Sequence, residues 1–265
     1  NPDSWEGWHW GAAHTYGFFW RLGMPEQYDL LEDTLQNAEM IVFWSNDPDS
    51  TRGTYTGQDS AMWRLWLKEK GIKMVFIDPF HNFTAAAMDG KWIPIRMGSG
   101  TAMAMAIAHV WITENTYDKD YVEKYAFGFD RLRHHVKRMT PEWAYGITTI
   151  KPDQIRKTAR LMAGAAPAVI IHPGRHATWY GDDTQRSRAI AILNALLGSW
   201  GRRGGFFIPE KAKLPAFPKP AYPKAKWSWK DINPGKYPFA TSDGSALTRL
   251  PSTITEPLDL ARDVT

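Results

Sequence analysis

The chain has 265 residues, which is enough for one large α/β domain or two small ones. An apolar fraction of 43% supports a buried core, and no window is apolar enough to cross a membrane. The absence of Cys excludes disulfides, thiolate zinc sites and an iron–sulfur cluster held by this chain itself, while a net charge of +4 from scattered Lys and Arg residues does not favour a nucleic-acid partner.

The opening residues, NPDSWEGWHWG, read as the middle of a functional loop, because they carry neither Met nor a basic leader. Between Asp3 and Arg21, Gly residues permit close approach of the backbone and Trp rings supply flat walls. One interpretation is an aromatic loop packed under a domain, and the other is a loop lying against a large planar cofactor. Gly favours the second, since it brings backbone to the ligand.

A helix is predicted over 26–38, followed by a buried strand over 40–44 (MIVFW). This apolar run stops abruptly at Ser45, Asn46 and Asp47, which favour a turn. Where a strand precedes a helix in this way, backbone N–H groups and short polar side chains converge on a point that suits the phosphate of a nucleotide-like ligand. The alternative is an ordinary strand-to-helix turn without a ligand.

A second helix (55–70) and a second strand follow, and this strand ends in Asp78 about thirty residues after the first, which is typical of a βαβ unit. A carboxylate at that point is placed to accept hydrogen bonds from ribose hydroxyls. The alternative is that Asp78 caps the next helix.

The next segment, 93–100, is expected to be extended and to close in a Gly98-Ser99-Gly100 turn. A third apolar strand over 168–172 opens into the loop PGRHATWYG, which holds Gly174, Arg175 and His176. Because ligands bind outside the carboxyl ends of parallel strands, three polar strand ends on one edge predict one site. Further helices are predicted over 101–113, 119–125, 152–164 and 184–200.

The sequence therefore predicts an α/β fold, a Rossmann-like parallel sheet flanked by helices over residues 1–208. Residues 209–265 are rich in Pro, Lys and aromatic residues without periodicity. We expect them to form an irregular extension without a core of its own, which wraps over a neighbour.

The ordered set of motifs resembles the molybdopterin oxidoreductases of the dimethyl sulfoxide reductase type. It consists of strand–SNDP, strand–IDP-x-x-x-x-TA, MGSG before an Ala-rich helix, PGRH with WYG, and G-x-x-GG. The opening NPDSWEGWHWG is similar to the branch of pyrogallol–phloroglucinol transhydroxylase. GRHATWYGDDTQR-x-R and GRRGGF are more similar to the polysulfide, thiosulfate and arsenate reductase branch.

The resemblance implies a bis-molybdopterin guanine dinucleotide cofactor holding molybdenum or tungsten. It implies that Ser4 ligates the metal, in keeping with the preference of a high-valent centre for hard oxygen ligands. It also implies that Asp3 and His176 are catalytic. The residues implied to bind the cofactor are Trp10, Gly11, His14, Ser45, Asn46, Asp47, Asp78, Gly98, Ser99, Gly174, Arg175 and His176. The family often has Asp at the position of Gly100.

Members of this family are several times longer, so we expect the chain to be a piece of a catalytic subunit, with domains before Asn1 and after Thr265 as partners. The reaction implied is oxidoreduction or hydroxyl transfer between polyphenols on a small-molecule substrate. The alternative is a polysulfide-, thiosulfate- or arsenate-type reductase that works with an iron–sulfur electron-transfer subunit. Iron–sulfur clusters are then expected only in other parts or subunits.

Two further hypotheses belong to other classes of protein. An NAD-dependent dehydrogenase is disfavoured, because no G-x-G-x-x-G follows a predicted strand. A non-catalytic binding module that retains the fold without a metal would be recognised by the absence of molybdenum and tungsten in the purified full-length protein.

Overall fold

Four parallel strands form the sheet of the computed structural model, in the order β3-β2-β1-β4. The model describes residues 28–49, 59–172 and 183–205. The strands are β1 (Met40–Trp44), β2 (Lys73–Asp78), β3 (Lys91–Pro94) and β4 (Val169–His172). All five residues of β1 are buried, as expected for a central strand covered on both faces.

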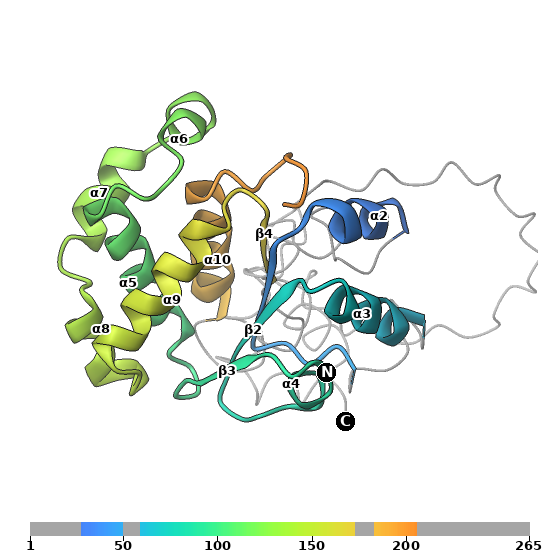
Figure 1. The fold of residues 1–265 in the computed structure, drawn as a ribbon. Helices are drawn as coiled ribbons and strands as arrows, with labels where there is room; N and C mark the ends of the chain where they lie inside the picture. Colours follow the sequence, from blue (N-terminus) through green and yellow to red (C-terminus); the bar gives the residue numbers. More distant parts are fainter. Residues whose placement is uncertain (1–27, 50–58, 173–182, 206–265) are drawn as a thin grey trace, which may run out of the picture. The chain divides into compact units, whose positions relative to one another are not determined.

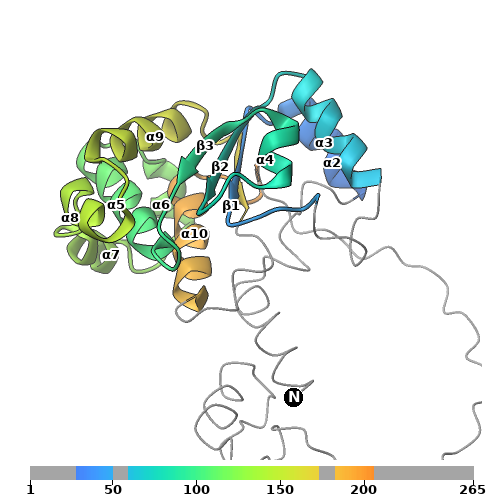
Figure 2. The ribbon, with the colours of Figure 1, turned by 90° about the horizontal axis from the view of Figure 1, so that it is seen from below.

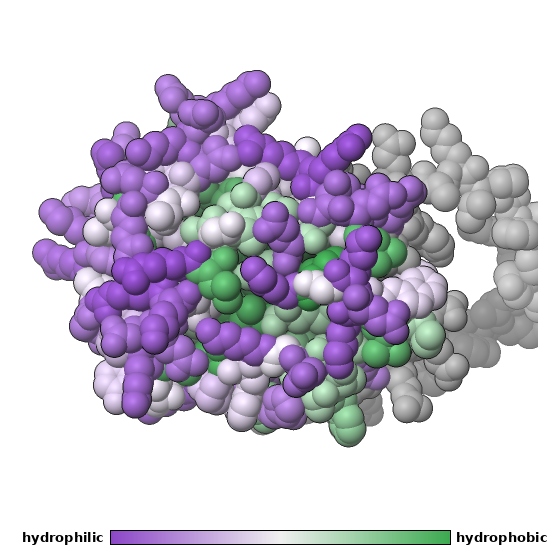
Figure 3. Space-filling view, in the orientation of Figure 1, coloured by the Kyte–Doolittle hydropathy of each residue, from purple (hydrophilic) through white to green (hydrophobic). Residues whose placement is uncertain are grey.

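Helices cover both faces of this sheet (Figures 1 and 2). On one face lie α2 (Tyr28–Asn37), α3 (Asp59–Glu69) and α4 (Phe83–Met88). On the other face lie α5 (Gly100–Thr113) and α10 (Asp183–Leu196), with α6 (Lys119–Tyr125), α7 (Phe129–Val136), α8 (Pro141–Thr148) and α9 (Pro152–Gly164) packed beyond them. In Figure 3, hydrophilic residues cover α6–α9, and apolar residues gather nearer the centre of that view.

The order of the strands creates a switch point between β1 and β4. The connections from β1 to β2 and from β2 to β3 run through α3 and α4, on one face. The connection from β3 to β4 runs through α5–α9 on the opposite face and returns to the other side of β1. Because these connections run in opposite directions along the sheet, the loops after β1 and β4 diverge, and ligands of doubly wound folds bind at such a point.

Buried side chains join the helices to the sheet. Phe43 and Phe76 stack with ring centroids 4.9 Å apart across β1 and β2. Asn194 of α10 is fully buried; its Oδ1 accepts a hydrogen bond from the N–H of Ile171, and its Nδ2 donates to the Ile171 carbonyl. These bonds satisfy backbone groups of β4 that have no neighbouring strand in the described sheet.

The predicted fold class is confirmed, with three local differences. Strand β3, which follows α4, begins at Lys91 and ends at Pro94, whereas the sequence predicted an extended segment over 93–100. Helix α4 was missed because it has only six residues. Helices α7 and α8 were also missed: α7 is rich in charges, and α8 begins at Pro141 after the cap of Thr140, whose side chain accepts from the N–H of Trp143.

The described residues lie within one compact unit. The expected domain boundary at 208 and the extension over 209–265 lie outside the described residues and stay predictions. No helix in the described ranges is both long enough and apolar enough to span a bilayer.

The G-x-x-GG turn after α10 is a packing motif at the amino ends of the strands. Gly204 has a φ of +74°, and its N–H donates to Asp33 Oδ2 at 2.8 Å. A Cβ at this position would lie 2.4 Å from the carbonyl oxygen of Asn37, at the end of α2. The motif therefore holds α2 and the chain before β4 together, at the edge of the sheet opposite to the predicted site.

We expect Gly204→Ala to lower the free energy of unfolding by about 3 kcal/mol, since the left-handed conformation costs Ala about 1–2 kcal/mol and the clash adds strain of similar size. Gly201→Ala is the matched control, because Gly201 has a φ of +72° and no atom within 4 Å of an added Cβ. Urea unfolding followed by circular dichroism measures both variants. Equal losses would contradict the packing role of Gly204.

Candidate functional site

The end of β1 turns sharply at the carboxyl edge of the sheet. Ser45 has a φ of +50°, and its N–H still donates to the Ile77 carbonyl of β2 at 2.8 Å. A non-Gly residue rarely adopts this conformation, and such strain is often found at binding sites. The turn carries the chain away from the sheet at Asn46 and Asp47, as the sequence predicted.

Asn82 joins the ends of β1 and β2. Its Nδ2 donates to the Asn46 carbonyl at 3.2 Å and lies 3.3 Å from Asp78 Oδ2. Its Oδ1 accepts from the N–H of Ala85 at 2.8 Å and so caps α4. The sequence analysis did not single out Asn82; its position four residues after the strand-ending Asp78, just before Thr84-Ala85, is the signal that could have found it.

The Asp47 carboxylate is engaged with the start of α4. Its Oδ1 accepts from the N–H of Thr84 at 3.0 Å and from the Thr84 hydroxyl at 2.7 Å. These bonds fix the turn after β1 against α4. In the structure, the Asp47 carboxylate binds Thr84 of α4. Its direct contact with a cofactor diphosphate therefore stays a prediction.

Asp78 ends β2 and is only 5% exposed. Its Oδ1 accepts from the N–H of Phe80 at 3.2 Å, and its backbone carbonyl accepts from Trp92 Nε1 at 3.0 Å. Burial raises the pKa of this carboxyl above its ordinary value of 3.8, against the hydrogen bonds from Phe80 and Asn82. Because Asn82 is the N-cap of α4, the alternative that Asp78 caps this helix is wrong.

Arg186, in the first half of α10, brings a cation to the same edge. Its side chain is buried, and its Nη1 donates to the carbonyl of Trp44, the last residue of β1, at 3.1 Å. Its charge acts on the pKa of Asp78, although burial of Asp78 outweighs it. The sequence analysis quoted the Arg only within a motif, because nothing in the pattern of α10 shows that it reaches β1.

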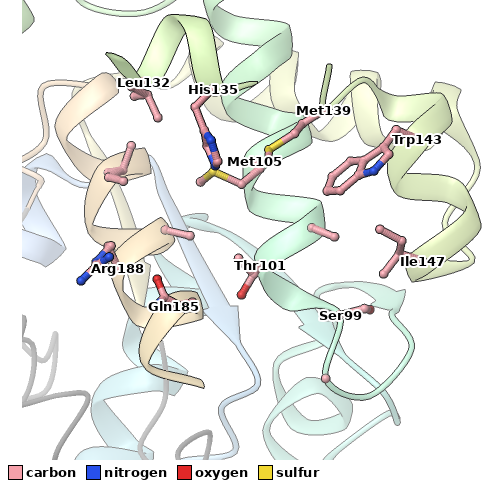
Figure 4. Close-up of a pocket in the computed structure, with 14 residues that line it drawn as sticks. Ser99, Thr101, Met105, Leu132, His135, Met139, Trp143, Ile147, Gln185 and Arg188 are labelled. Carbon is pink, nitrogen blue, oxygen red and sulfur yellow. The ribbon is translucent and has the colours of Figure 1, made fainter. Parts of the chain in front are cut away.

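A groove begins beside this edge at Gly98 and Ser99 and follows α5 (Figure 4). Its volume is about 480 Å³. Thr101 and Gln185 lie near the end that Ser99 marks, and Met105, His135, Met139 and Trp143 line the rest. The turn at Gly98 and Ser99, which is predicted to bind the cofactor, therefore borders a cavity with one polar end.

Eight predicted site residues lie outside the described part of the chain: Asp3, Ser4, Trp10, Gly11, His14, Gly174, Arg175 and His176. Their roles stay predictions. Among the residues that are described, no three His, Asp or Glu side chains gather as metal ligands. The described site is thus a polar edge that joins the ends of β1 and β2, with a buried carboxyl and a buried guanidinium.

We expect Asn82→Ala to lower the free energy of unfolding by about 2–3 kcal/mol, because it removes a helix cap and leaves the Asn46 carbonyl without its amide donor. Asn82→Asp keeps the capping oxygen but places a second carboxylate beside Asp78. Its stability should therefore fall below that of Asn82→Ala at pH 7 and exceed it at pH 4. Chemical unfolding at both pH values measures the stabilities of the two variants. If the same variant were the more stable one at pH 7 and at pH 4, the contact between position 82 and Asp78 would be contradicted.

The raised pKa of Asp78 predicts a pH dependence of stability. The folded chain binds the proton of the Asp78 carboxyl more tightly than the unfolded chain does. The contribution of the protonated carboxyl to the free energy of unfolding is therefore fully present below pH 3.8, and it is lost as the pH rises through the folded pKa. The stability of the unsubstituted chain relative to Asp78→Asn should therefore decrease as the pH rises from 4 towards neutrality. Unfolding titrations at several pH values would refute this if the difference stayed flat or increased.

Comparison with known proteins identifies the family and supports the fold. A profile of the molybdopterin oxidoreductase family matches residues 10–235. The solved structure of acetylene hydratase from Pelobacter acetylenicus resembles the chain with a TM-score of 0.60 at 21% identity, over 77% of this chain and 26% of that one, which supports the fold alone.

Two curated relatives are more similar in sequence. The pyrogallol hydroxytransferase large subunit of Pelobacter acidigallici is 48% identical over 169 residues, which cover 62% of this chain and 19% of that protein. The thiosulfate reductase molybdopterin-containing subunit PhsA of Salmonella typhimurium is 38% identical over 150 residues, covering 57% and 20%. The chain thus spans about a fifth of the length of these relatives. With most of its length matched by the family profile, the chain belongs to the molybdopterin oxidoreductase family.

Proposed function

We propose that the chain is the part of a catalytic subunit that binds one nucleotide end of a bis-molybdopterin guanine dinucleotide cofactor holding molybdenum or tungsten. The observation that carries this proposal is the joining of the β1 and β2 ends by Asn82 at the carboxyl edge of the sheet, beside the switch point between β1 and β4. Nucleotides of doubly wound folds bind outside the carboxyl ends of the strands, and acceptors and donors at this edge support the proposal.

The described residues fit such a group. The buried Asp78 supplies acceptors for ribose hydroxyls, and the turn at Ser45 and Asn46 brings backbone to a diphosphate. Within the described ranges, the indole N–H of Trp44 is wholly buried without a hydrogen-bond acceptor, next to Gly100. Gly98 and Ser99 border the groove on the side proposed for guanine. An unsatisfied buried donor at this edge is the kind of feature that a polar ligand explains.

The reaction that we propose is hydroxyl transfer between polyphenols, which rests on the 48% identity to pyrogallol hydroxytransferase. When bound, the cofactor supplies a metal centre able to change its oxidation state. Ser4 would hold the metal through its side-chain oxygen, and Asp3 would accept and return a proton at the phenolic hydroxyl. Trp10, Gly11, His14, Gly174 and Arg175 would lie along the pterin, with His176 near the reacting atoms. Proton transfer by a positioned group contributes roughly 10²–10⁴ in rate.

The second candidate is reduction of a sulfur or arsenic compound, favoured by the 38% identity to a thiosulfate reductase subunit. In this case electrons would pass to or from iron–sulfur clusters in another part of the subunit or in a partner subunit. Either reaction requires the rest of the catalytic subunit, since the chain spans about a fifth of these relatives.

The test uses the full-length protein, produced in a host that makes the cofactor. We expect molybdenum or tungsten together with guanine nucleotide, and anaerobic conversion of pyrogallol without an external electron acceptor. Ser4→Ala should retain protein and nucleotide but change the visible absorption of the metal centre. Reduction of thiosulfate with a low-potential dye, and no conversion of pyrogallol, would select the second candidate. Absence of both metals and of nucleotide would refute an enzyme of this class and leave a non-catalytic binding module.

A further inference from the structure

The side chain of Arg186 crosses from α10 to the end of β1, over the first residue of α5. Its Nη1 donates to the Trp44 carbonyl at 3.1 Å, and the whole side chain is buried. The residue follows the loop after β4, whereas Trp44 ends β1. The guanidinium therefore lies at the switch point between these two strands.

Gly100 provides the space for this arrangement. A Cβ at position 100 would lie 2.8 Å from Arg186 Cδ and 3.1 Å from both Arg186 Cγ and Trp44 Nε1. The flexible stem of Arg186 would have to move, and the guanidinium would move with it. Glycine at the first position of α5 thus determines where the cation sits.

Three donor groups converge here. The guanidinium remains charged in proteins and therefore attracts the oxygens of a phosphate group. The Trp44 indole N–H, wholly buried and without an acceptor among the described residues, lies against the same glycine. The N-terminus of α5, a helix of 14 residues, adds a favourable field for an anion.

We propose that Arg186 binds the diphosphate of the cofactor's nucleotide end at the switch point, and that Gly100 is required to position it. This inference rests on the proposed function, because it assumes a cofactor that carries a diphosphate. Arg186 is then a binding residue contributed by α10, in addition to the turn at Ser45 and Asn46. The competing interpretation is that Arg186 only ties α10 to β1.

The experiment compares four variants of the full-length protein, each isolated with its cofactor: Arg186→Gln, Arg186→Lys, Gly100→Ala and Arg203→Gln. Arg203 is the control, since it is exposed and lies beside Gly204, at the opposite edge of the sheet. Bound guanine nucleotide, released by acid hydrolysis, and bound metal are measured after dialysis against increasing concentrations of pyrophosphate. Thermal unfolding of each apoprotein separates binding from folding.

We expect Arg186→Gln and Gly100→Ala to release nucleotide about tenfold faster than the unsubstituted protein, because a hydrogen bond to a charged group is lost or misplaced. Arg186→Lys should release nucleotide at a rate between those of these two variants and of the unsubstituted protein, because Lys keeps the charge but lacks the planar guanidinium. Arg203→Gln should retain nucleotide fully. If Arg186→Gln does not accumulate, the pyrophosphate sensitivity of Arg186→Lys decides the question.

Full retention of nucleotide by Arg186→Lys and Gly100→Ala, even with lowered thermal stability, would overturn this inference and leave the proposed function intact. An unsubstituted protein that carries neither nucleotide nor metal would overturn the proposed function and this inference with it.

Discussion

The site depends on a single side-chain amide. Asn82 donates to the Asn46 carbonyl after β1, lies beside the carboxylate that ends β2, and caps α4. Neighbouring parallel strands share only backbone bonds along their length, so their loops would otherwise be free to diverge. Because one amide is bonded on both sides, the two loops form one polar surface. The buried Asp78 is kept in place by the same amide, although burial disfavours its charge.

The carboxyl edge and the amino edge of the sheet differ in the groups that pack there. At the carboxyl edge, buried polar groups of β1, β2 and α10 face one another, as at Trp44 and Arg186. At the amino edge, Gly204 brings backbone into contact with the end of α2 and leaves no room for a side chain at this position. Rigid packing at one edge supports a binding surface at the other, because functional groups need a scaffold that holds them in place.

Much of the fold follows from the sequence by simple rules. The strands β1 and β4 are continuous apolar runs bounded by turn residues, and α5 is an uninterrupted Ala- and Met-rich segment. The spacing from β1 to Asp78 is that of a βαβ unit, which fixes parallel pairing. Short elements escaped these rules: α4 has six residues and owes its start to Asn82 and Asp47, partners that a periodicity search does not see.

For the site, the sequence by itself determined which strand ends carry polar residues, and hence that Asn46 and Asp78 would share an edge, because strand direction is set by the length of each connection. It did not determine the role of Asp47, whose carboxylate the fold uses to hold α4. Only the tertiary structure decided that Arg186 reaches the end of β1 across Gly100. The two residues are far apart in the chain, and their contact depends on how α5 and α10 pack, which no local pattern encodes.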